Sequence, residues 1–187
     1  MKKIVIFASG NGSNAEQIIL HLNHTKTAKI SAILTNKSTA GVLERAKKHQ
    51  IPTYIFNKAD LENGVVLDII NQHKPDLIVL AGFLLKFPEH IINQYPNKII
   101  NIHPALLPNY GGKGMYGIHV HEAVLANKEE YTGITIHHVN KNYDEGAIIL
   151  QEKVFVGDCD TATEIAERIH KLEYDHFPVT INNLLRE

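Results

Sequence analysis

The chain has 187 residues, of which 44% are hydrophobic and 21% are charged, and this composition is typical of one α/β domain with a full core. Its net charge of −1 gives no electrostatic basis for binding nucleic acid or an anionic membrane, so a small-molecule partner is favoured. The single cysteine, Cys159, excludes an intrachain disulfide framework and a cysteine-based zinc site, and it fits a cytoplasmic protein in a reducing compartment.

The first apolar run, Ile4 to Ala8, lacks alternation and therefore predicts a buried parallel strand. We expect it to be too short for a signal peptide or a membrane span. A glycine-rich turn over 9–14 follows it. A helix comes next, because apolar side chains recur at i, i+3, i+4 and i+7 and form one stripe: Ala15, Ile18, Ile19 and Leu22.

The glycine-rich turn predicts a phosphate site, because the first N–H groups of a helix are unpaired and lie at the positive end of its dipole. The spacing Gly10-x-Gly12-x-x-Ala15 also fits the loose dinucleotide fingerprint. An NAD site needs an acidic residue after the second strand, and none follows the expected strand 29–34, although Lys37 could serve NADP. A single phosphomonoester is favoured, and a dinucleotide or a purely structural turn remain alternatives.

The β/α alternation continues through the middle of the chain. We expect a helix over 41–49, a strand over 53–56, a helix over 61–73 and a strand over 76–81. The apolar loop 82–87 leaves that last strand. Because ligands of open parallel sheets bind beyond the carboxyl ends of the strands, this loop is expected to border a crevice. Its side chains either wall a flat aromatic ligand or simply pack beneath the loop.

The next strand, 99–103, carries two polar side chains at its exit. In an extended strand Asn101 and His103 point to the same side, roughly 6 to 7 Å apart along the chain. An amide donor beside an imidazole suits acyl chemistry, in which one group holds a carbonyl oxygen and the other handles a proton. The alternative is that these residues only form the turn that ends the strand.

Four glycines in the segment 109–117 predict a mobile loop, which is either a lid over the substrate or a solvent loop without a role. A helix over 119–126 follows. The pairs His119-x-His121 and His137-His138 resemble metal ligands, but neither offers a matched third ligand, so we expect no metal site.

The last third of the chain contains strands over 132–139 and 147–155 with no helix between them, which predicts an antiparallel pair. The connection carries Asp144, a carboxylate that would raise the pKa of His103 if the two side chains met. Thr161 and Glu164 form a capping-box pattern that begins the final helix. Pro178 is expected to bend or interrupt this helix.

Four segments, taken together, resemble the folate-dependent formyltransferase family. They are Gly10-Asn11-Gly12-Ser13-Asn14, Ala81-Gly82-Phe83, Asn101 through Pro108, and Asp144-Glu145-Gly146 followed by Ile148 through Gln151. The resemblance runs from the first strand to the last helix. It implies an α/β, Rossmann-like fold with a mostly parallel sheet flanked by helices and an antiparallel C-terminal strand pair. The glycine turn is similar to that of the branch that formylates glycinamide ribonucleotide.

The resemblance also implies roles for particular residues. Asn101, His103 and Asp144 correspond to the catalytic set of the family. The ribonucleotide and its phosphate would contact Gly12, Ser13, Asn14, His170, Lys171 and Glu173. The co-substrate, 10-formyltetrahydrofolate, would contact Leu84, Leu85, Lys86, Phe87, Asn101, Asn140, Lys141, Asn142, Tyr143 and Asp144.

The implied reaction transfers the formyl group of 10-formyltetrahydrofolate to the amine of glycinamide ribonucleotide in purine biosynthesis, without a metal. Asn101 and a protonated His103 would stabilise the oxyanion, and Asp144 would keep His103 charged. Two features depart from familiar relatives: Leu85 stands where an arginine is expected, and the loop 109–117 is several residues longer.

We expect one domain over 1–187, with a ribonucleotide-phosphate half at about 1–100 and a folate and catalytic half at about 101–187. The related hydrolase and methionyl-tRNA branches resemble longer chains with an added domain, for which 187 residues leave no room. A monomer or a weak homodimer in the cytoplasm is the expected state.

Overall fold

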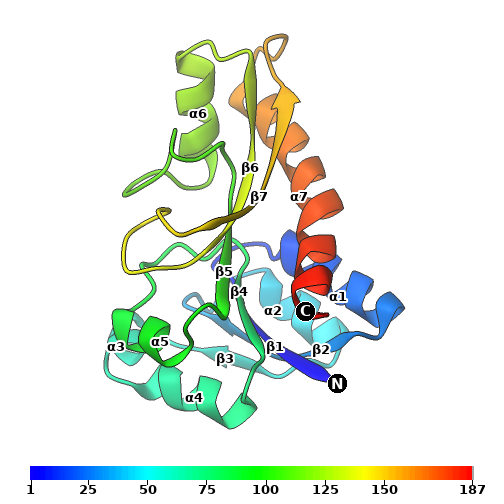
Figure 1. Ribbon diagram of the computed structural model, residues 1–187, viewed down its shortest axis with the longest axis vertical. Helices are drawn as coiled ribbons and strands as arrows, with labels where there is room; N and C mark the ends of the chain where they lie inside the picture. Colours follow the sequence, from blue (N-terminus) through cyan, green and yellow to red (C-terminus); the bar gives the residue numbers. More distant parts are fainter. Residues whose placement is uncertain (187) are drawn as a thin grey trace.

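The computed structural model describes residues 1–186, and a single seven-stranded sheet runs through its centre in the order β3-β2-β1-β4-β5-β6-β7 (Figure 1). Five neighbouring strands are parallel: β1 (Lys2–Phe7), β2 (Ala28–Thr35), β3 (Thr53–Ile55), β4 (Leu77–Leu80) and β5 (Ile99–His103). The last two, β6 (Tyr131–His138) and β7 (Ile148–Phe155), form the predicted antiparallel pair. β6 is also antiparallel to β5, which joins the pair to the parallel part of the sheet.

Helices cover both faces of the sheet. Buried side chains of α1 (Ser13–Thr25), α2 (Val42–Lys48), α6 (Ile118–Ala126) and α7 (Ala162–Leu184) belong to one core cluster. Those of α3 (Lys58–Glu62), α4 (Val65–His73) and α5 (Glu89–Gln94) belong to the other. Figure 1 shows α7 lying beside α1, away from α3, α4 and α5. Strand β1 supplies both clusters alternately, because successive side chains of a strand face opposite sides.

The helical content differs from the sequence-based expectation at three points. The single helix expected over 61–73 is two helices, because Gly64 adopts a left-handed φ of 97° between them and Asn57 caps the first in a capping box with Asp60. The six-residue helix α5 was not predicted, since it is too short to give a periodic pattern. The final helix continues through Pro178, whose buried neighbours Phe177 and Ile181 anchor that turn.

The predicted start of α7 is confirmed. The side chain of Thr161 accepts a hydrogen bond from the Glu164 N–H, and the Glu164 carboxylate accepts one from the Thr161 N–H. This reciprocal capping box fixes where the helix begins. None of the helices within residues 1–186 is both long enough and apolar enough to cross a membrane.

The strand order reverses at β1, which pairs with β2 on one side and with β4 on the other. The loops after β1 and β4 therefore diverge and open a crevice beyond the carboxyl ends of the strands. Ser9 holds the two loops in place: its N–H donates to the Gly82 carbonyl at 3.0 Å, and its hydroxyl accepts from the Leu84 N–H at 3.0 Å.

Candidate active site

A cavity of about 820 Å³ lies at this crevice. Its wall combines the glycine turn 10–14, the loop after β4, the end of β5, the glycine-rich loop 112–117, the connection after β6 and part of α7. The expectation that the apolar loop and the Asn101/His103 strand border one crevice is confirmed. The volume lies in the range of small-molecule sites.

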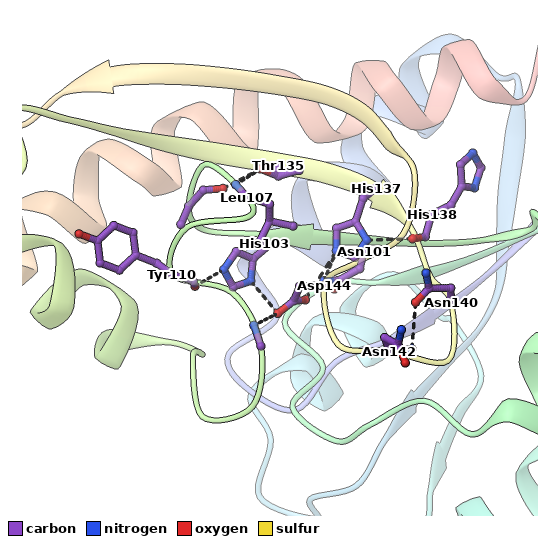
Figure 2. A network of polar contacts seen from close by, with 12 residues as sticks. Asn101, His103, Leu107, Tyr110, Thr135, His137, His138, Asn140, Asn142 and Asp144 are labelled. Atoms are coloured by element: carbon purple, nitrogen blue, oxygen red, sulfur yellow. Dashed lines mark hydrogen bonds and ion pairs between the residues drawn. The ribbon is translucent and has the colours of Figure 1, made fainter.

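Four polar side chains form a continuous network on one side of this cavity (Figure 2). The Asp144 carboxylate lies between two imidazoles, with its Oδ2 3.6 Å from Nδ1 of His103 and its Oδ1 3.6 Å from Nε2 of His137. Nε2 of His137 in turn lies 3.2 Å from Nδ2 of Asn101. The three residues that the sequence singled out for catalysis are thus brought together, and a fourth, His137, connects two of them.

His137 holds the Asn101 side chain in a defined orientation. Its Nδ1 lies 2.9 Å from the His138 carbonyl oxygen, so Nδ1 carries the proton in the neutral ring and Nε2 is left to accept. Nε2 then accepts a hydrogen bond from the Asn101 amide nitrogen. Sequence reasoning considered His137 only as a metal ligand, because its role depends on the register that puts it opposite Asn101 across β5 and β6.

Asp144 is held in place by its own backbone and by the glycine-rich loop. The residue adopts a left-handed φ of 55°, and its Oδ2 accepts a hydrogen bond from the Gly112 N–H at 2.9 Å. Burial acts to raise the pKa of the Asp144 carboxyl, but the adjacent His137, His103 and the Gly112 N–H together lower it below its usual value. The carboxylate is therefore ionised at neutral pH.

Burial and the two oxygen acceptors beside His103 act in opposite directions on the pKa of this imidazole. The ring is 3% exposed, and this burial lowers the pKa of His103 more than the nearby Asp144 carboxylate and the Tyr110 carbonyl raise it. Nε2 lies 2.7 Å from the Tyr110 carbonyl oxygen and donates to it. Both ring nitrogens therefore lie next to an oxygen acceptor, Nε2 beside the Tyr110 carbonyl and Nδ1 3.6 Å from the Asp144 carboxylate.

The glycine turn forms the opposite end of the cavity, where Gly12, Ser13 and Asn14 all line the wall. Gly12 has a φ of 75°, and a Cβ added there would lie 2.5 Å from the Val42 side chain, so only glycine fits. The turn leads directly into α1, whose first N–H groups face this part of the cavity. This geometry matches the anion site that the sequence predicted.

Residues of α7 approach the same end of the cavity. Nδ2 of Asn14 donates to Oε2 of Glu173 at 2.9 Å, and burial raises the pKa of Glu173 to about 7. His170 lies one turn before Glu173 and also lines the cavity. Both residues therefore line the same cavity as the glycine turn.

His121 on α6 is a further wall residue that sequence reasoning considered only as a metal ligand. It is 3% exposed, and within residues 1–186 its Nδ1 has no hydrogen-bond partner. Burial lowers the pKa of His121 to about 4, so the ring is neutral. His119, the other histidine of that sequence pair, is exposed, and its Nδ1 lies 3.2 Å from the Glu122 carboxylate.

Both segments expected to contact folate line the cavity. The wall includes Leu84, Leu85, Lys86 and Phe87 from the first segment and Asn140, Asn142, Tyr143 and Asp144 from the second. The ammonium of Lys86 lies 5.9 Å from the centre of the Tyr143 ring. Phe87 is buried and packs edge-on against Phe7, so the loop both walls the cavity and anchors itself in the core.

Two of the expected contact residues lie outside the cavity wall. Lys171 is exposed, and its ammonium pairs with Asp175 one turn along α7 at 2.7 Å. Adjacent helix positions diverge by about 100°, so Lys171 cannot share the face of His170 and Glu173. Lys141 is likewise exposed at the turn after β6. Over residues 1–186 no group of three or more His, Cys, Asp or Glu side chains is arranged to hold a metal ion.

Comparison with known proteins relates the whole chain to one family. A family model described as formyl transferase matches residues 2–181. The chain is 39% identical to phosphoribosylglycinamide formyltransferase of Bacillus subtilis over 191 residues, which cover 99% of this chain and 95% of that protein. It is 40% identical over 182 residues to the chloroplastic phosphoribosylglycinamide formyltransferase of Arabidopsis thaliana, covering 91% of this chain. The chain spans 62% of the length of that plant protein.

A solved structure gives the same relation. The phosphoribosylglycinamide formyltransferase of Anaplasma phagocytophilum superposes with a TM-score of 0.90 at 30% sequence identity, covering 99% of this chain and 87% of that one. The mostly parallel sheet with its antiparallel β5-β6-β7 edge is thus shared with a solved protein similar over almost all of this chain.

Proposed function

The chain belongs to the formyl transferase family, and we propose that it transfers the formyl group of 10-formyltetrahydrofolate to the amine of glycinamide ribonucleotide. The products are formylglycinamide ribonucleotide and tetrahydrofolate, as in purine biosynthesis. Because several relatives that carry the name of this activity are matched over most of their length, the substrates follow from that similarity.

One observation supports the proposal most directly. The network of Asn101, His103 and Asp144 and the glycine turn 10–14 line the same cavity. An acyl-transfer group and an anion site in one cavity fit a substrate that carries both a reactive amine and a phosphomonoester. A dinucleotide would need an acidic residue after β2, and that strand is followed by Asn36 and Lys37.

The resting state of the network suggests the order of proton transfer. As the neutral amine attacks the formyl carbon, the Asn101 amide N–H donates to the developing oxyanion. The free Nδ1 of His103 takes a proton from the attacking amine, directly or through water. The imidazolium that forms has acceptors at both nitrogens, Asp144 and the Tyr110 carbonyl, which compensate its buried charge.

The same proton completes the reaction. His103 returns it to N10 of the folate as the C–N10 bond breaks, so one N–H is lost from the amine and one is gained by tetrahydrofolate. Because burial lowers the pKa of His103, the imidazolium is a ready proton donor to N10. Asp144 stabilises this imidazolium.

The remaining contacts follow the division of the cavity. Gly12, Ser13 and Asn14 hold the phosphate, and His170 and Glu173 lie along the ribose. Leu84 to Phe87 and the segment 140–144 hold the folate. The half 1–100 and the half 101–187 therefore both contribute to each substrate site, within one domain. The protein acts in the cytoplasm as a monomer or a weak homodimer.

Product analysis tests this function. Incubation with 10-formyltetrahydrofolate and glycinamide ribonucleotide should yield a ribonucleotide that is one formyl group heavier by mass spectrometry, with one tetrahydrofolate released per product. A ribonucleotide that stays unmodified while both substrates are present and the protein is folded would overturn the proposal.

A further inference from the structure

A charged cluster packs against the back of the glycine turn, on the side away from the cavity. Glu16, in the first turn of α1, is 7% exposed, and its carboxylate contacts three basic side chains, two on α2 and one on the residue after it. Their distances to Glu16 are 3.0 Å for Arg45, 3.5 Å for Lys48 and 2.8 Å for His49. Nothing in the proposed reaction uses this cluster.

Arg45 differs from Lys48 and His49 because its guanidinium also donates hydrogen bonds to the glycine turn. Its Nε donates to the Asn11 carbonyl oxygen at 2.8 Å, and its Nη2 donates to the Asn11 side-chain oxygen at 3.4 Å. A third donor, Nη1, reaches Glu16. The planar guanidinium therefore fixes the turn relative to the first turn of α1, which a flexible lysine ammonium cannot do.

The contact with the Asn11 carbonyl determines where the next N–H points. In a trans peptide the C=O and the following N–H lie on opposite sides of the chain. The Asn11 carbonyl faces Arg45 behind the turn, so the Gly12 N–H is directed to the other side, where Gly12 lines the cavity. A hydrogen bond from a cation to the carbonyl also polarises the peptide and strengthens this N–H as a donor.

The cluster also compensates charge. Among residues 1–186, the cavity wall includes only two lysines and no arginine, and both lysines, Lys86 and Lys113, belong to the loops around the folate and glycine-rich segments. The phosphate end therefore relies on backbone N–H groups. Without its partners, the buried Glu16 carboxylate in the first turn of α1 would repel a phosphate, and the Arg45 guanidinium at 3.0 Å offsets that charge.

We propose that Arg45 is a positioning residue for the phosphate of the substrate, acting through the Asn11–Gly12 peptide without touching the ligand. The inference rests on the proposed function, since it assumes that the glycine turn holds the phosphate of a ribonucleotide. Affinity for the phosphate group would therefore depend on Arg45, a side chain outside the cavity wall.

The test compares Arg45→Met with two matched variants. Arg45→Met should raise the KM for glycinamide ribonucleotide about tenfold, the effect of one lost charge-assisted hydrogen bond, while kcat and the KM for 10-formyltetrahydrofolate stay within about threefold. Arg45→Lys, which keeps the charge but not the fork, should fall between wild type and Arg45→Met. Lys48→Met removes the same charge from the cluster without touching Asn11 and should change the KM less than about twofold.

A substrate without the phosphate separates positioning from a general structural effect. With the unphosphorylated glycinamide ribonucleoside, Arg45→Met and wild type should have equal kcat/KM. A lower kcat/KM of Arg45→Met on the ribonucleoside would overturn the inference. An equal rise in the KM for the ribonucleotide in Lys48→Met would also overturn it.

Binding of ribose 5-phosphate, measured by calorimetry, distinguishes this inference from the proposed function. If wild type and Arg45→Met bind ribose 5-phosphate with equal affinity, the role of Arg45 is contradicted and the proposed function is not affected. Wild type that binds neither ribose 5-phosphate nor the ribonucleotide contradicts the phosphate site itself, and with it both proposals.

Discussion

At the scale of single residues, the site depends on how one carboxylate is shared between two imidazoles. Asp144 is ionised and lies 3.6 Å from both His103 and His137. Burial lowers the pKa of His103, whereas Nδ1 of His137 is held by the His138 carbonyl. The two rings therefore have different roles: one exchanges a proton, and the other orients the Asn101 amide.

Removing the oxyanion donor or the proton carrier should have a large effect on the chemical step. Asn101 is expected to contribute about 3 kcal/mol as an oxyanion donor, and His103 a rate factor of about 100 or more by proton transfer, so Asn101→Ala and His103→Ala should each lower kcat at least ~100-fold. Steady-state assays with both substrates saturating measure this. A purified, folded His103→Ala variant with kcat within about threefold of wild type would contradict the assignment.

His137 should act mainly by orienting Asn101. Replacing it by Phe removes the acceptor that orients the amide, and we expect kcat to fall about tenfold with little change in either KM. His137→Gln restores an acceptor oxygen and should recover much of the loss. If Gln were no better than Phe, steric packing in β6 would explain the effect instead.

The site also shows the limit of sequence reasoning at this scale. Alternation along a strand was enough to put Asn101 and His103 on one side, because that depends on local geometry alone. The pKa of His103 also depends on burial by distant segments, which opposes the effect of Asp144 and cannot be read from local sequence. The position of Lys171 was missed for a simpler reason, since a contiguous stretch of helix cannot present every side chain to one ligand.

At the scale of secondary-structure elements, local signals with a defined chemistry were the most reliable. The Thr161–Glu164 capping box gave the start of α7, and the apolar stripe of α1 is buried as expected. Elements that depend on a conformational break were less predictable. The left-handed Gly64 divides one expected helix in two, while tertiary packing carries α7 through Pro178.

The capping box offers a test of element stability that leaves the site intact. Thr161→Ala should lower the free energy of unfolding by about 1 kcal/mol, because the Glu164 N–H loses its acceptor. Activity should not change, since this end of α7 lies outside the cavity wall. Thr163→Ala, an exposed neighbour inside the helix, serves as the control in urea unfolding. Equal destabilisation by the two variants would show that the cap contributes nothing.

At the scale of the whole molecule, the sequence was sufficient for the class of fold, because unbroken apolar runs alternate with amphipathic helices. The order of the strands was not readable from spacing, and the antiparallel contact of β5 with β6 was missed. That contact is what puts His137 opposite Asn101. The role of His137 was therefore not predicted for the same reason that the pairing of β5 with β6 was not predicted.

The dependence of stability on pH should report the Glu16 cluster. The hydrogen bonds from His49 and Arg45 and the charge of Lys48 outweigh the effect of burial. Together they lower the pKa of Glu16 to about 2, below its usual value of 4.5. Between these values the unfolded chain binds more protons, so stability rises with pH through this window and is lost as pH falls. Between pH 3 and 6, the free energy of unfolding measured with denaturant should rise less steeply with pH in Glu16→Gln than in wild type. Parallel curves would mean that the carboxyl has its usual pKa in the folded protein.

The central claim is that one cavity couples the folate to a ribonucleotide amine, and the release of tetrahydrofolate tests it most directly. Wild-type protein supplied with 10-formyltetrahydrofolate should release tetrahydrofolate only when glycinamide ribonucleotide is added, at a rate that saturates with the ribonucleotide and falls at least ~100-fold in Asn101→Ala. Release that proceeds at the same rate without the ribonucleotide would contradict the account and would show that water is the acceptor.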